Sequence, residues 1–403
     1  QALRDLRNPW LQMDLVRERT YPFGAVTANL TGMLGTDEPL AGVERKYDPC
    51  LRAINGTATY QKGADGIRLP GAQYGSAMVV RVDDGHVLAA VDWPTFDPND
   101  FSNAPVEFLG ARSLSSPYEP GSIMKSVGIA MLIDGGYTYS EDRIVAPGFY
   151  EVYPGQYIKN FLVADNRQLT TAGVLQTSSN TGISVLADRM PKAEATRYLR
   201  DFGFGEITGI DFLGESSGQV LPVDRVDALT RYNQFFGQGI SVTAAQMASS
   251  YQTLANDGVR VPLRLVDGCM TSEGDYVPEP VGEPVQVVSA SAAQQTVRMM
   301  ETVVTQGALR NTLEIPGYRV AAKTGTAEIA TSEGYGDDRV ISLAGMAPAE
   351  DPEYVVLVSF YKPQTSRVSS AAAPAFHEIL SHVLKHYRVA PSSEPAVLPP
   401  LTW

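Results

Sequence analysis

Ser122 and Lys125 stand three positions apart in SSPYEPGSIMKSVGIAMLIDGG, residues 115–136. The stretch after the Pro-Gly pair is apolar on nearly every side, which predicts a buried helix over residues 122–134. Residues three apart on a helix lie roughly 5 to 6 Å apart at Cβ, so the lysine amine can reach the serine hydroxyl. Burial disfavours the ammonium form, and a neutral amine can take the serine proton. The pair therefore predicts a serine nucleophile with a lysine base, and backbone N–H groups at the helix start could stabilise an oxyanion.

A second Ser-x-x-Lys pair, Ser359 and Lys362, lies in the strand-like run YVVLVSFYK. Residues three apart on a strand point to opposite faces, so this pair is not expected to cooperate. About one such pair is expected by chance in a chain of this size. The first pair alone therefore does not separate a catalytic serine from a capping serine beside a lysine that reaches solvent.

Two further motifs each occur once: Ser-Ser-Asn between two helical patterns, and Lys-Thr-Gly within an alternating strand. In their order along the chain, the three motifs resemble the active-site signature of the penicillin-recognising serine acyltransferases, which are the penicillin-binding proteins and the serine β-lactamases. The residues that carry this resemblance are Ser122, Lys125, Ser178, Asn180, Lys323, Thr324, Gly325 and Thr326.

Longer strings resemble the transpeptidase domain of class B penicillin-binding proteins over roughly residues 73–388. They include TSSNTG, FGFGEITGIDFLGE, GQGISVTAAQMASSYQTLANDG and YRVAAKTGTA. Upstream, GVERKYDPCLRAINGT is similar to the membrane-distal part of that family's amino-terminal pedestal. The chain departs from the family in the short connection between Asn55 and Ser76, and in Ala322, where relatives usually have glycine. Glu119 before Pro-Gly-Ser resembles the division-type branch more than the elongation-type branch.

The resemblance implies acyl transfer through a covalent intermediate. Ser122 would attack the carbonyl of a terminal D-alanyl-D-alanine, release D-alanine and pass the acyl group to an amine of a neighbouring stem peptide. Lys125 would be the base for acylation, and Ser178 would relay a proton to the leaving amine. Asn180 would bind both Lys125 and the substrate amide.

The resemblance also implies how the substrate is held. A charged Lys323 and the hydroxyls of Thr324 and Thr326 would bind the terminal carboxylate, and the N–H groups of Ser122 and Thr326 would form the oxyanion hole. β-Lactams would enter as mimics of the dipeptide. The implied partners are peptidoglycan stem peptides, β-lactams, a membrane glycosyltransferase, and division or elongation proteins.

Two other functions share these motifs. A β-lactamase needs a carboxylate that activates water for deacylation, and Glu206 and Glu215 follow the Ser-Ser-Asn segment, although within strings that resemble penicillin-binding proteins. The other alternative is a β-lactam sensor or a scaffold without turnover. Intact catalytic residues argue against a scaffold and leave a sensor open.

The elements that position these motifs follow from local patterns. Two apolar runs around the Asp-Asp-Gly turn at 83–85 predict a β-hairpin. Spacings of three and four residues predict helices between about 120 and 260, and alternation near the carboxyl end predicts strands followed by a final helix. Strands at both ends indicate one mixed sheet. The family resemblance implies an α/β (α+β) transpeptidase fold, with an antiparallel sheet flanked by helices and a helical subdomain.

We expect three regions along the chain. Residues 1–72 have short apolar runs and no long periodic helix, and we interpret them as a remnant of the pedestal. Residues 73–390 would form the transpeptidase domain. Residues 391–403 are the proline-rich PSSEPAVLPPLTW, and this composition predicts an extended, poorly packed tail.

The composition argues against a protein that binds the nucleic-acid backbone. The 403 residues are 44% hydrophobic and 19% charged, which supports ordinary folded cores, and the net charge is −13 without a basic run. No apolar run is long enough to cross a membrane, so we expect a membrane anchor to lie outside this sequence. The resemblance places the catalytic domain on the periplasmic or extracytoplasmic side of a bacterial membrane.

No cofactor or metal is expected. His382 and His386 have a helical i, i+4 spacing, but two histidines on a surface helix are more often solvated. Cys50 and Cys269 are too few for a disulfide framework and lack metal-ligand spacing. The glycines of GFGEITG miss the spacing of a dinucleotide-binding loop.

Overall fold

A five-stranded sheet in the order β13-β14-β15-β3-β4 forms the centre of the computed structural model. Its strands are β3 (Tyr74–Arg81), β4 (Val87–Trp93), β13 (Ala321–Thr331), β14 (Gly334–Ala347) and β15 (Tyr354–Tyr361). Every neighbouring pair is antiparallel. The antiparallel sheet implied by the family resemblance is therefore confirmed, and the mixed sheet inferred from strand positions is wrong. The structure describes residues 21–22, 24–34, 39–47, 72–102, 104–161, 165–271, 274–331, 334–364 and 368–403.

The predicted hairpin at 83–85 is confirmed as the connection between β3 and β4. Gly85 has a φ of +70°, and a Cβ there would stand 2.5 Å from the carbonyl oxygen of Pro262, so both the turn and its packing need glycine. Asp84 accepts hydrogen bonds from Arg81 and Arg264 across this turn. The turn is thus tied to the loop that follows β9 (Val259–Arg260).

Helices cover both faces of the sheet. Alternation along β15 sends Val356, Val358 and Phe360 into one buried cluster with Phe376 of α13 (Ala373–His386). Leu357 joins the core on the opposite face, where α10 (Ala244–Ala255) and α11 (Ala290–Thr305) lie. The larger helices are α5 (Met124–Asp134), α7 (Asn180–Ala187), α8 (Lys192–Asp201), α10 (Ala244–Ala255), α11 (Ala290–Thr305) and α13 (Ala373–His386). The shorter helices are α1 (Ala28–Thr31), α2 (Gly42–Lys46), α4 (Arg112–Ser115), α6 (Thr171–Gln176), α9 (Ala228–Asn233) and α12 (Arg310–Leu313).

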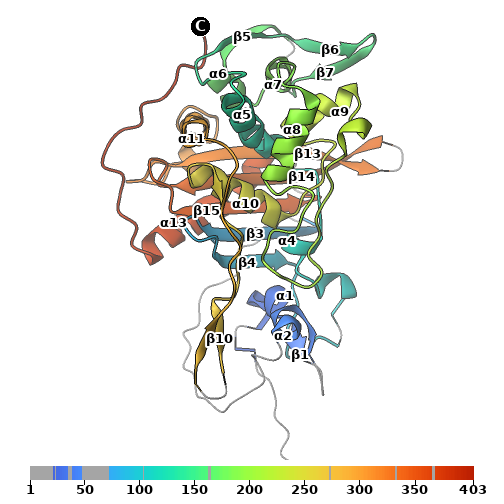
Figure 1. Ribbon diagram of the computed structural model, residues 1–403, viewed down its shortest axis with the longest axis vertical. Coiled ribbons are helices and arrows are strands. Elements are labelled where there is room, and N and C mark those ends of the chain that lie inside the picture. Colours follow the sequence, from blue (N-terminus) through green and yellow to red (C-terminus); the bar gives the residue numbers. More distant parts are fainter. Residues whose placement is uncertain are drawn as a thin grey trace, which may run out of the picture.

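Figure 1 shows α5 to α9 gathered above the sheet with a border of short strands. These strands are β5 (Arg143–Ala146), β6 (Phe149–Tyr153), β7 (Gln156–Lys159) and β8 (Arg167–Thr170). This helical part confirms the predicted helices between residues 120 and 260. Side chains cap the starts of α6, α7, α9 and α10 but not those of α5 and α8. In α10, for example, Oγ1 of Thr243 accepts from the N–H of Gln246, whose side chain accepts from the N–H of Thr243.

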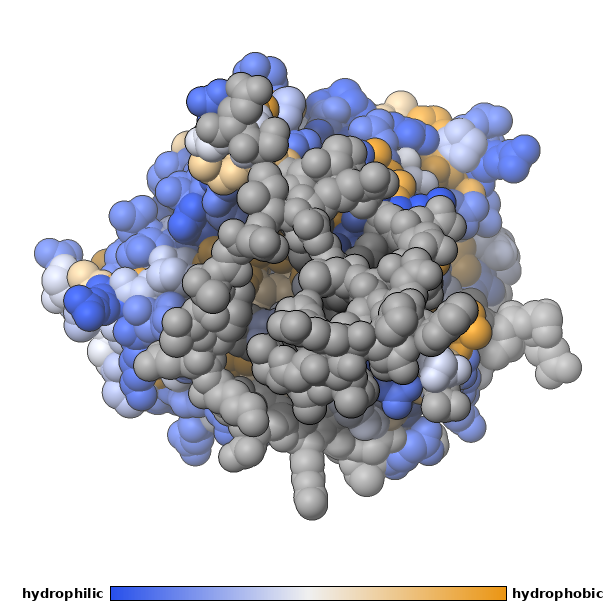
Figure 2. All heavy atoms as spheres, turned by 90° about the horizontal axis from the view of Figure 1, so that it is seen from below, coloured by the Kyte–Doolittle hydropathy of each residue, from blue (hydrophilic) through white to orange (hydrophobic). Residues whose placement is uncertain are grey.

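The amino-terminal residues that the structure describes form only short elements, as the sequence predicts. β1 (Met33–Leu34), β2 (Pro39–Ala41), α1 and α2 lie at the lower end of the molecule, where the hairpin of β10 (Gly268–Met270) and β11 (Tyr276–Pro278) also extends (Figure 1). Cys269 in β10 is disulfide-bonded. Most of the short connection between Asn55 and Ser76 lies outside the described residues. Viewed from this end, the described surface is mainly hydrophilic (Figure 2).

The proline-rich tail is extended and largely exposed, as predicted, but its last residues dock on the helical part. Thr402 forms an antiparallel bridge with Leu169 of β8, and Leu401 packs against the main core. No local pattern predicts this docking, because the residues that contact the end of the tail lie about 230 positions earlier in the chain. Two small strands, β9 (Val259–Arg260) and β12 (Val285–Gln286), and the 3₁₀ turns η2 (Gly24–Val26), η3 (Val106–Phe108), η4 (Gly121–Ile123), η5 (Val223–Arg225), η6 (Gln234–Phe236) and η7 (Ser369–Ala372) complete the fold.

Candidate active site

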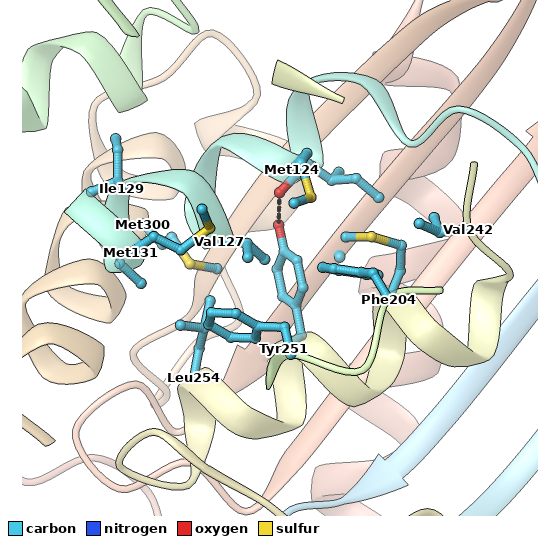
Figure 3. Packing of buried hydrophobic residues seen from close by; sticks show 14 of the residues in the cluster. Met124, Val127, Ile129, Met131, Phe204, Val242, Tyr251, Leu254 and Met300 are labelled. Atoms are coloured by element: carbon cyan, nitrogen blue, oxygen red, sulfur yellow. Dashed lines mark hydrogen bonds between the residues drawn. The ribbon is translucent and has the colours of Figure 1, made fainter. Parts of the chain in front are cut away.

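Ser122 lies in the 3₁₀ turn η4, which runs directly into α5. Gly121 has a φ of +60°, and a Cβ there would lie 2.7 Å from the carbonyl oxygen of Thr326, so the turn can lie against β13 only with glycine at this position. From the other side, Tyr251 of α10 points to the start of α5 and donates a 2.9 Å hydrogen bond to the carbonyl oxygen of Ile123 (Figure 3). The nucleophile segment is therefore held between the sheet and α10.

The helix that follows is buried on all sides, as predicted. Residues Met124 to Leu132 are all buried, and Lys125 has no exposed surface. Met124 and Val127 belong to the same buried cluster as Tyr251 and Met300 of α11 (Figure 3). A lysine in this position has no route to solvent, so its amine must be satisfied inside the protein.

The amine of Lys125 is surrounded by oxygen atoms from three motifs. Its Nζ lies 2.7 Å from Oγ of Ser122, 2.6 Å from Oδ1 of Asn180, 2.9 Å from the carbonyl oxygen of Ser178 and 3.1 Å from Oγ of Ser178. Burial, and then the charge of Lys323, hold the pKa of Lys125 well below its usual value. A neutral amine 2.7 Å from a serine hydroxyl can accept the hydroxyl proton.

The turn between α6 and α7 carries Ser178 and Asn180. Ser178 has a φ of +55°, the left-handed conformation that an ordinary side chain seldom adopts. Ser179 caps α7, because its Oγ accepts from the N–H of Gly182 at 3.0 Å. The strained turn directs both Ser178 and Asn180 toward Lys125, and Asn180 also donates to the carbonyl oxygen of Lys159 at 3.1 Å.

Lys323 in β13 reaches the same place from the sheet. It is buried, and its Nζ lies 3.1 Å from Oγ of Ser178 and 2.9 Å from the carbonyl oxygen of Thr324. Gly325 allows the strand to approach the nucleophile segment, since a Cβ there would be 3.0 Å from the carbonyl oxygen of Pro120. Thr324 and Thr326 are half-buried on the same stretch.

The charge state of Lys323 differs from the expectation. The family resemblance implies a charged lysine for carboxylate binding, but burial lowers the pKa of Lys323 to about 7. The surroundings of Lys125 and of Lys323 therefore both favour the neutral amine. A carboxylate ligand beside Lys323 would favour its charged form.

Two supporting residues were not identified as such from the sequence. In the sequence Glu119 indicates only the subtype, yet its Oε1 accepts from the N–H of Gly239 at 2.8 Å and from the hydroxyl of Tyr335 at 3.1 Å. Burial raises the pKa of Glu119. It thus ties the loop after η6 and the strand β14 to the segment that precedes Ser122. Tyr251 is the second, and no local signal in the sequence distinguishes it from an ordinary core tyrosine.

The competing candidates lie elsewhere. Lys362 pairs with Asp338 at 3.0 Å and is not a partner of the buried Ser359, as expected for a strand. Glu215 accepts hydrogen bonds from the N–H and hydroxyl of Thr208. Within the described ranges, the hydrogen-bond partners of Ser122 and Lys125 include no carboxylate.

Metal and membrane features can be stated for the described part of the chain. It contains no cluster of three or more histidine, cysteine, aspartate or glutamate side chains that could hold a metal. The exposed His382 and His386 have ring centroids 5.8 Å apart. None of the helices in these ranges combines the length and the apolar character needed to cross a membrane.

Comparison with known proteins agrees with this geometry. Residues 75–381 match the penicillin binding protein transpeptidase domain. The chain is 34% identical over 436 aligned residues to penicillin-binding protein PbpB of Mycolicibacterium smegmatis, with 95% of this chain and 67% of that protein covered. It is 30% identical over 431 aligned residues to peptidoglycan D,D-transpeptidase FtsI of Escherichia coli, covering 97% and 71%. For PbpB of Mycobacterium tuberculosis, the chain spans 64% of the relative's length.

Solved structures show the same fold. Penicillin binding protein 3 of Mycobacterium tuberculosis, complexed with ampicillin, superposes with a TM-score of 0.86 at 31% identity, covering 96% of this chain and 93% of that chain. A peptidoglycan synthetase from Bifidobacterium adolescentis gives a TM-score of 0.85 at 28% identity, covering 97% and 78%.

Proposed function

Because the chain belongs to the penicillin-binding protein transpeptidase family, we propose that it is the catalytic part of a division-type peptidoglycan D,D-transpeptidase that β-lactams acylate. The observation that carries this proposal is the buried amine of Lys125, 2.7 Å from Oγ of Ser122 and 2.6 Å from Oδ1 of Asn180. The similarity to proteins named PbpB and FtsI supports the division type over the elongation type.

Acylation starts when Lys125 takes the proton of Ser122, whose oxygen attacks the carbonyl carbon of the penultimate D-alanine. A C–O bond forms, and the N–H groups of Ser122 and Thr326 stabilise the oxyanion. The C–N bond to the terminal D-alanine then breaks, and its nitrogen receives a proton through Ser178. The position of Oγ of Ser178, 3.1 Å from the amine of Lys125, supports this relay.

The second half of the reaction reverses these roles. An amine of a neighbouring stem peptide attacks the ester carbonyl, and Lys125 with Ser178 removes the proton of the amine. The new amide bond forms as the C–O bond to Ser122 breaks, and Ser122 recovers its proton. A β-lactam undergoes the same first step, but its ring-opened amine stays attached.

Substrate binding uses the edge of β13. We assign the terminal carboxylate to Lys323, Thr324 and Thr326, because this stretch lies beside the nucleophile turn. Asn180, whose amide nitrogen donates to a backbone carbonyl, would also contact the amide of the substrate. Gly325 is required for the close approach of the strand.

The remaining assignments concern the whole protein. Residues 73–390 would be the transpeptidase domain, residues 1–72 the end of the pedestal, and residues 391–403 a carboxyl-terminal segment. We place the domain on the extracytoplasmic side of a bacterial membrane, and the disulfide-bonded state of Cys269 supports an oxidising compartment. The protein partners would be a membrane glycosyltransferase and division proteins.

Fluorescent penicillin tests the proposal. The wild-type protein should become labelled with one equivalent, and peptide mapping should place the adduct on Ser122. Ser122→Ala should not be labelled, whereas Ser359→Ala, the control from the second Ser-x-x-Lys pair, should be labelled normally. Stoichiometric labelling of Ser122→Ala would overturn the assignment.

A further inference from the structure

Residues 389–403, which we call the carboxyl-terminal strap, link the two parts of the molecule that carry the active-site motifs. After α13 the strap runs along one side of the structure and reaches β5 and α6 in the helical part (Figure 1). Two groups of hydrogen bonds hold it, one at each end. Between them, Glu394, Pro395 and Val397 border a cavity of about 700 Å³ and are not packed into the core.

The first anchor lies next to the strand of the Lys-Thr-Gly motif. The hydroxyl of Tyr318 donates to the carbonyl oxygen of Val389 at 2.7 Å. Ser392 pairs with the same segment, since its N–H donates to Gly317 at 2.9 Å and its Oγ accepts from the N–H of Arg319 at 2.9 Å. This segment leads directly into β13.

The second anchor lies at the entry to α6. The N–H of Thr170 donates to the carbonyl oxygen of Leu401 at 3.1 Å, and its hydroxyl donates to that of Pro400 at 2.5 Å. The indole N–H of Trp403 donates to the carbonyl oxygen of Ile144 in β5 at 3.3 Å. The strap therefore contacts β5, β8 and α6 together.

Gly173 shows how closely the strap is seated on α6. A Cβ at this position would lie 1.9 Å from the carbonyl oxygen of Leu401, so any side chain there must displace the strap. The carbonyl of Gly173 in turn accepts from the N–H of Thr177 at 3.0 Å and from its hydroxyl at 2.7 Å. Thr177 directly precedes Ser178, so the strap acts on a helix that ends at the catalytic turn.

We propose that the carboxyl-terminal strap is a positioning element for acylation, which fixes α6 and hence the turn of Ser178 and Asn180 relative to Lys125 and Lys323. This inference rests on the proposed function. β13 and the turn after α6 meet directly, because Nζ of Lys323 lies 3.1 Å from Oγ of Ser178. A misplacement of about 1 Å at a reacting centre can cost on the order of 10²-fold in rate. Loosening of α6 should thus slow the acylation step while the carboxylate site on β13 is kept.

The test compares the full chain with a variant that ends at Val397 and with Gly173→Ala. Stopped-flow labelling with fluorescent penicillin gives the acylation rate constant and the dissociation constant of the initial complex separately. Both variants should lose about tenfold or more in the rate constant, with little change in the dissociation constant. The peptide Leu-Pro-Pro-Leu-Thr-Trp, added at millimolar concentration, should restore part of the rate of the shortened chain. The matched control is Val397→Ala, which should behave as wild type because the Val397 side chain is 84% exposed.

The outcomes separate this inference from the proposed function. A wild-type protein that is not acylated would reject the proposed function itself. A normally acylated wild type together with folded variants of unchanged rate constant would reject the positioning role alone. If the shortened chain does not fold, Gly173→Ala decides, because it retains every residue of the strap. Unfolding of both variants would also overturn the proposal, since the strap would then act on global stability.

Discussion

Replacement of Lys125 by methionine should nearly abolish acylation by penicillin without unfolding the protein. Methionine keeps an unbranched side chain as far as Cε and removes the amine that four oxygen contacts surround. The fold loses those hydrogen bonds, but it no longer has to bury an ionisable group. The two effects oppose each other, so thermal melting should change by only a few degrees.

The expected loss follows from the role of the amine. A positioned general base contributes about 10²- to 10⁴-fold to a rate, which corresponds to about 3 to 5 kcal/mol of transition-state stabilisation. Lys125→Met should lose this factor at saturating penicillin, because the amine acts on the chemical step. Lys323→Met should instead weaken the initial complex strongly, because that lysine is assigned to the carboxylate.

Stopped-flow labelling with fluorescent penicillin measures both constants. Lys362→Met is the matched control, since it belongs to the Ser-x-x-Lys pair whose lysine contacts Asp338. An acylation rate constant within tenfold of wild type for a folded Lys125→Met would refute Lys125 as the base. Identical profiles for Lys125→Met and Lys323→Met would refute the separate roles.

Three other measurements test the site. Since the pKa of Lys323 is about 7 and only its protonated form attracts a carboxylate, initial binding of penicillin should weaken as the pH rises through neutrality, which a pH series of the dissociation constant would show. Nitrocefin should give a burst of one equivalent and then near-silence, because the hydrogen-bond partners of Ser122 and Lys125 in the described ranges include no carboxylate that could activate water, and sustained turnover would favour a β-lactamase. Gly121→Ala should lower the melting temperature by several degrees, because its φ is +60° and its Cβ would clash with β13; an unchanged melting curve would contradict this account.

Local patterns in the sequence predicted the elements well. The Asp-Asp-Gly turn fixed the hairpin of β3 and β4, and the continuous apolar stretch after the Pro-Gly pair predicted α5 with Lys125 inside it. The direction of strand pairing was not accessible in this way. β3 pairs with β15, and nothing in either strand's own alternation distinguishes an antiparallel partner from a parallel one.

The sequence was enough to predict which residues form the site. It was not enough to predict their pKa values or the contacts that hold the site in place. Three short motifs identified Ser122, Lys125 and Lys323, but the lowered pKa of Lys323 depends on how deeply β13 is covered, which only the fold determines. The docking of the strap depends on a missing Cβ at Gly173 and on a carbonyl of Leu401, two residues without a chemical signature. Proline-rich composition predicts extended backbone and carries no information about what that backbone contacts.

A buried lysine is commonly neutralised by a carboxylate, and the surroundings of Lys125 differ from this in a way that can be tested. Its partners in the described part of the chain are hydroxyl, amide and carbonyl oxygens, and these leave the pKa low. Asn180→Asp would place a carboxylate where an amide oxygen now lies 2.6 Å from the amine, at nearly unchanged volume. A nearby negative charge favours the ammonium form, so the pKa of Lys125 should rise and the acylation rate should recover only at higher pH. Asn166→Asp, in the loop before β8, is the control, and a uniform loss for Asn180→Asp at every pH would show that the amide acts through shape and not through the proton of Lys125.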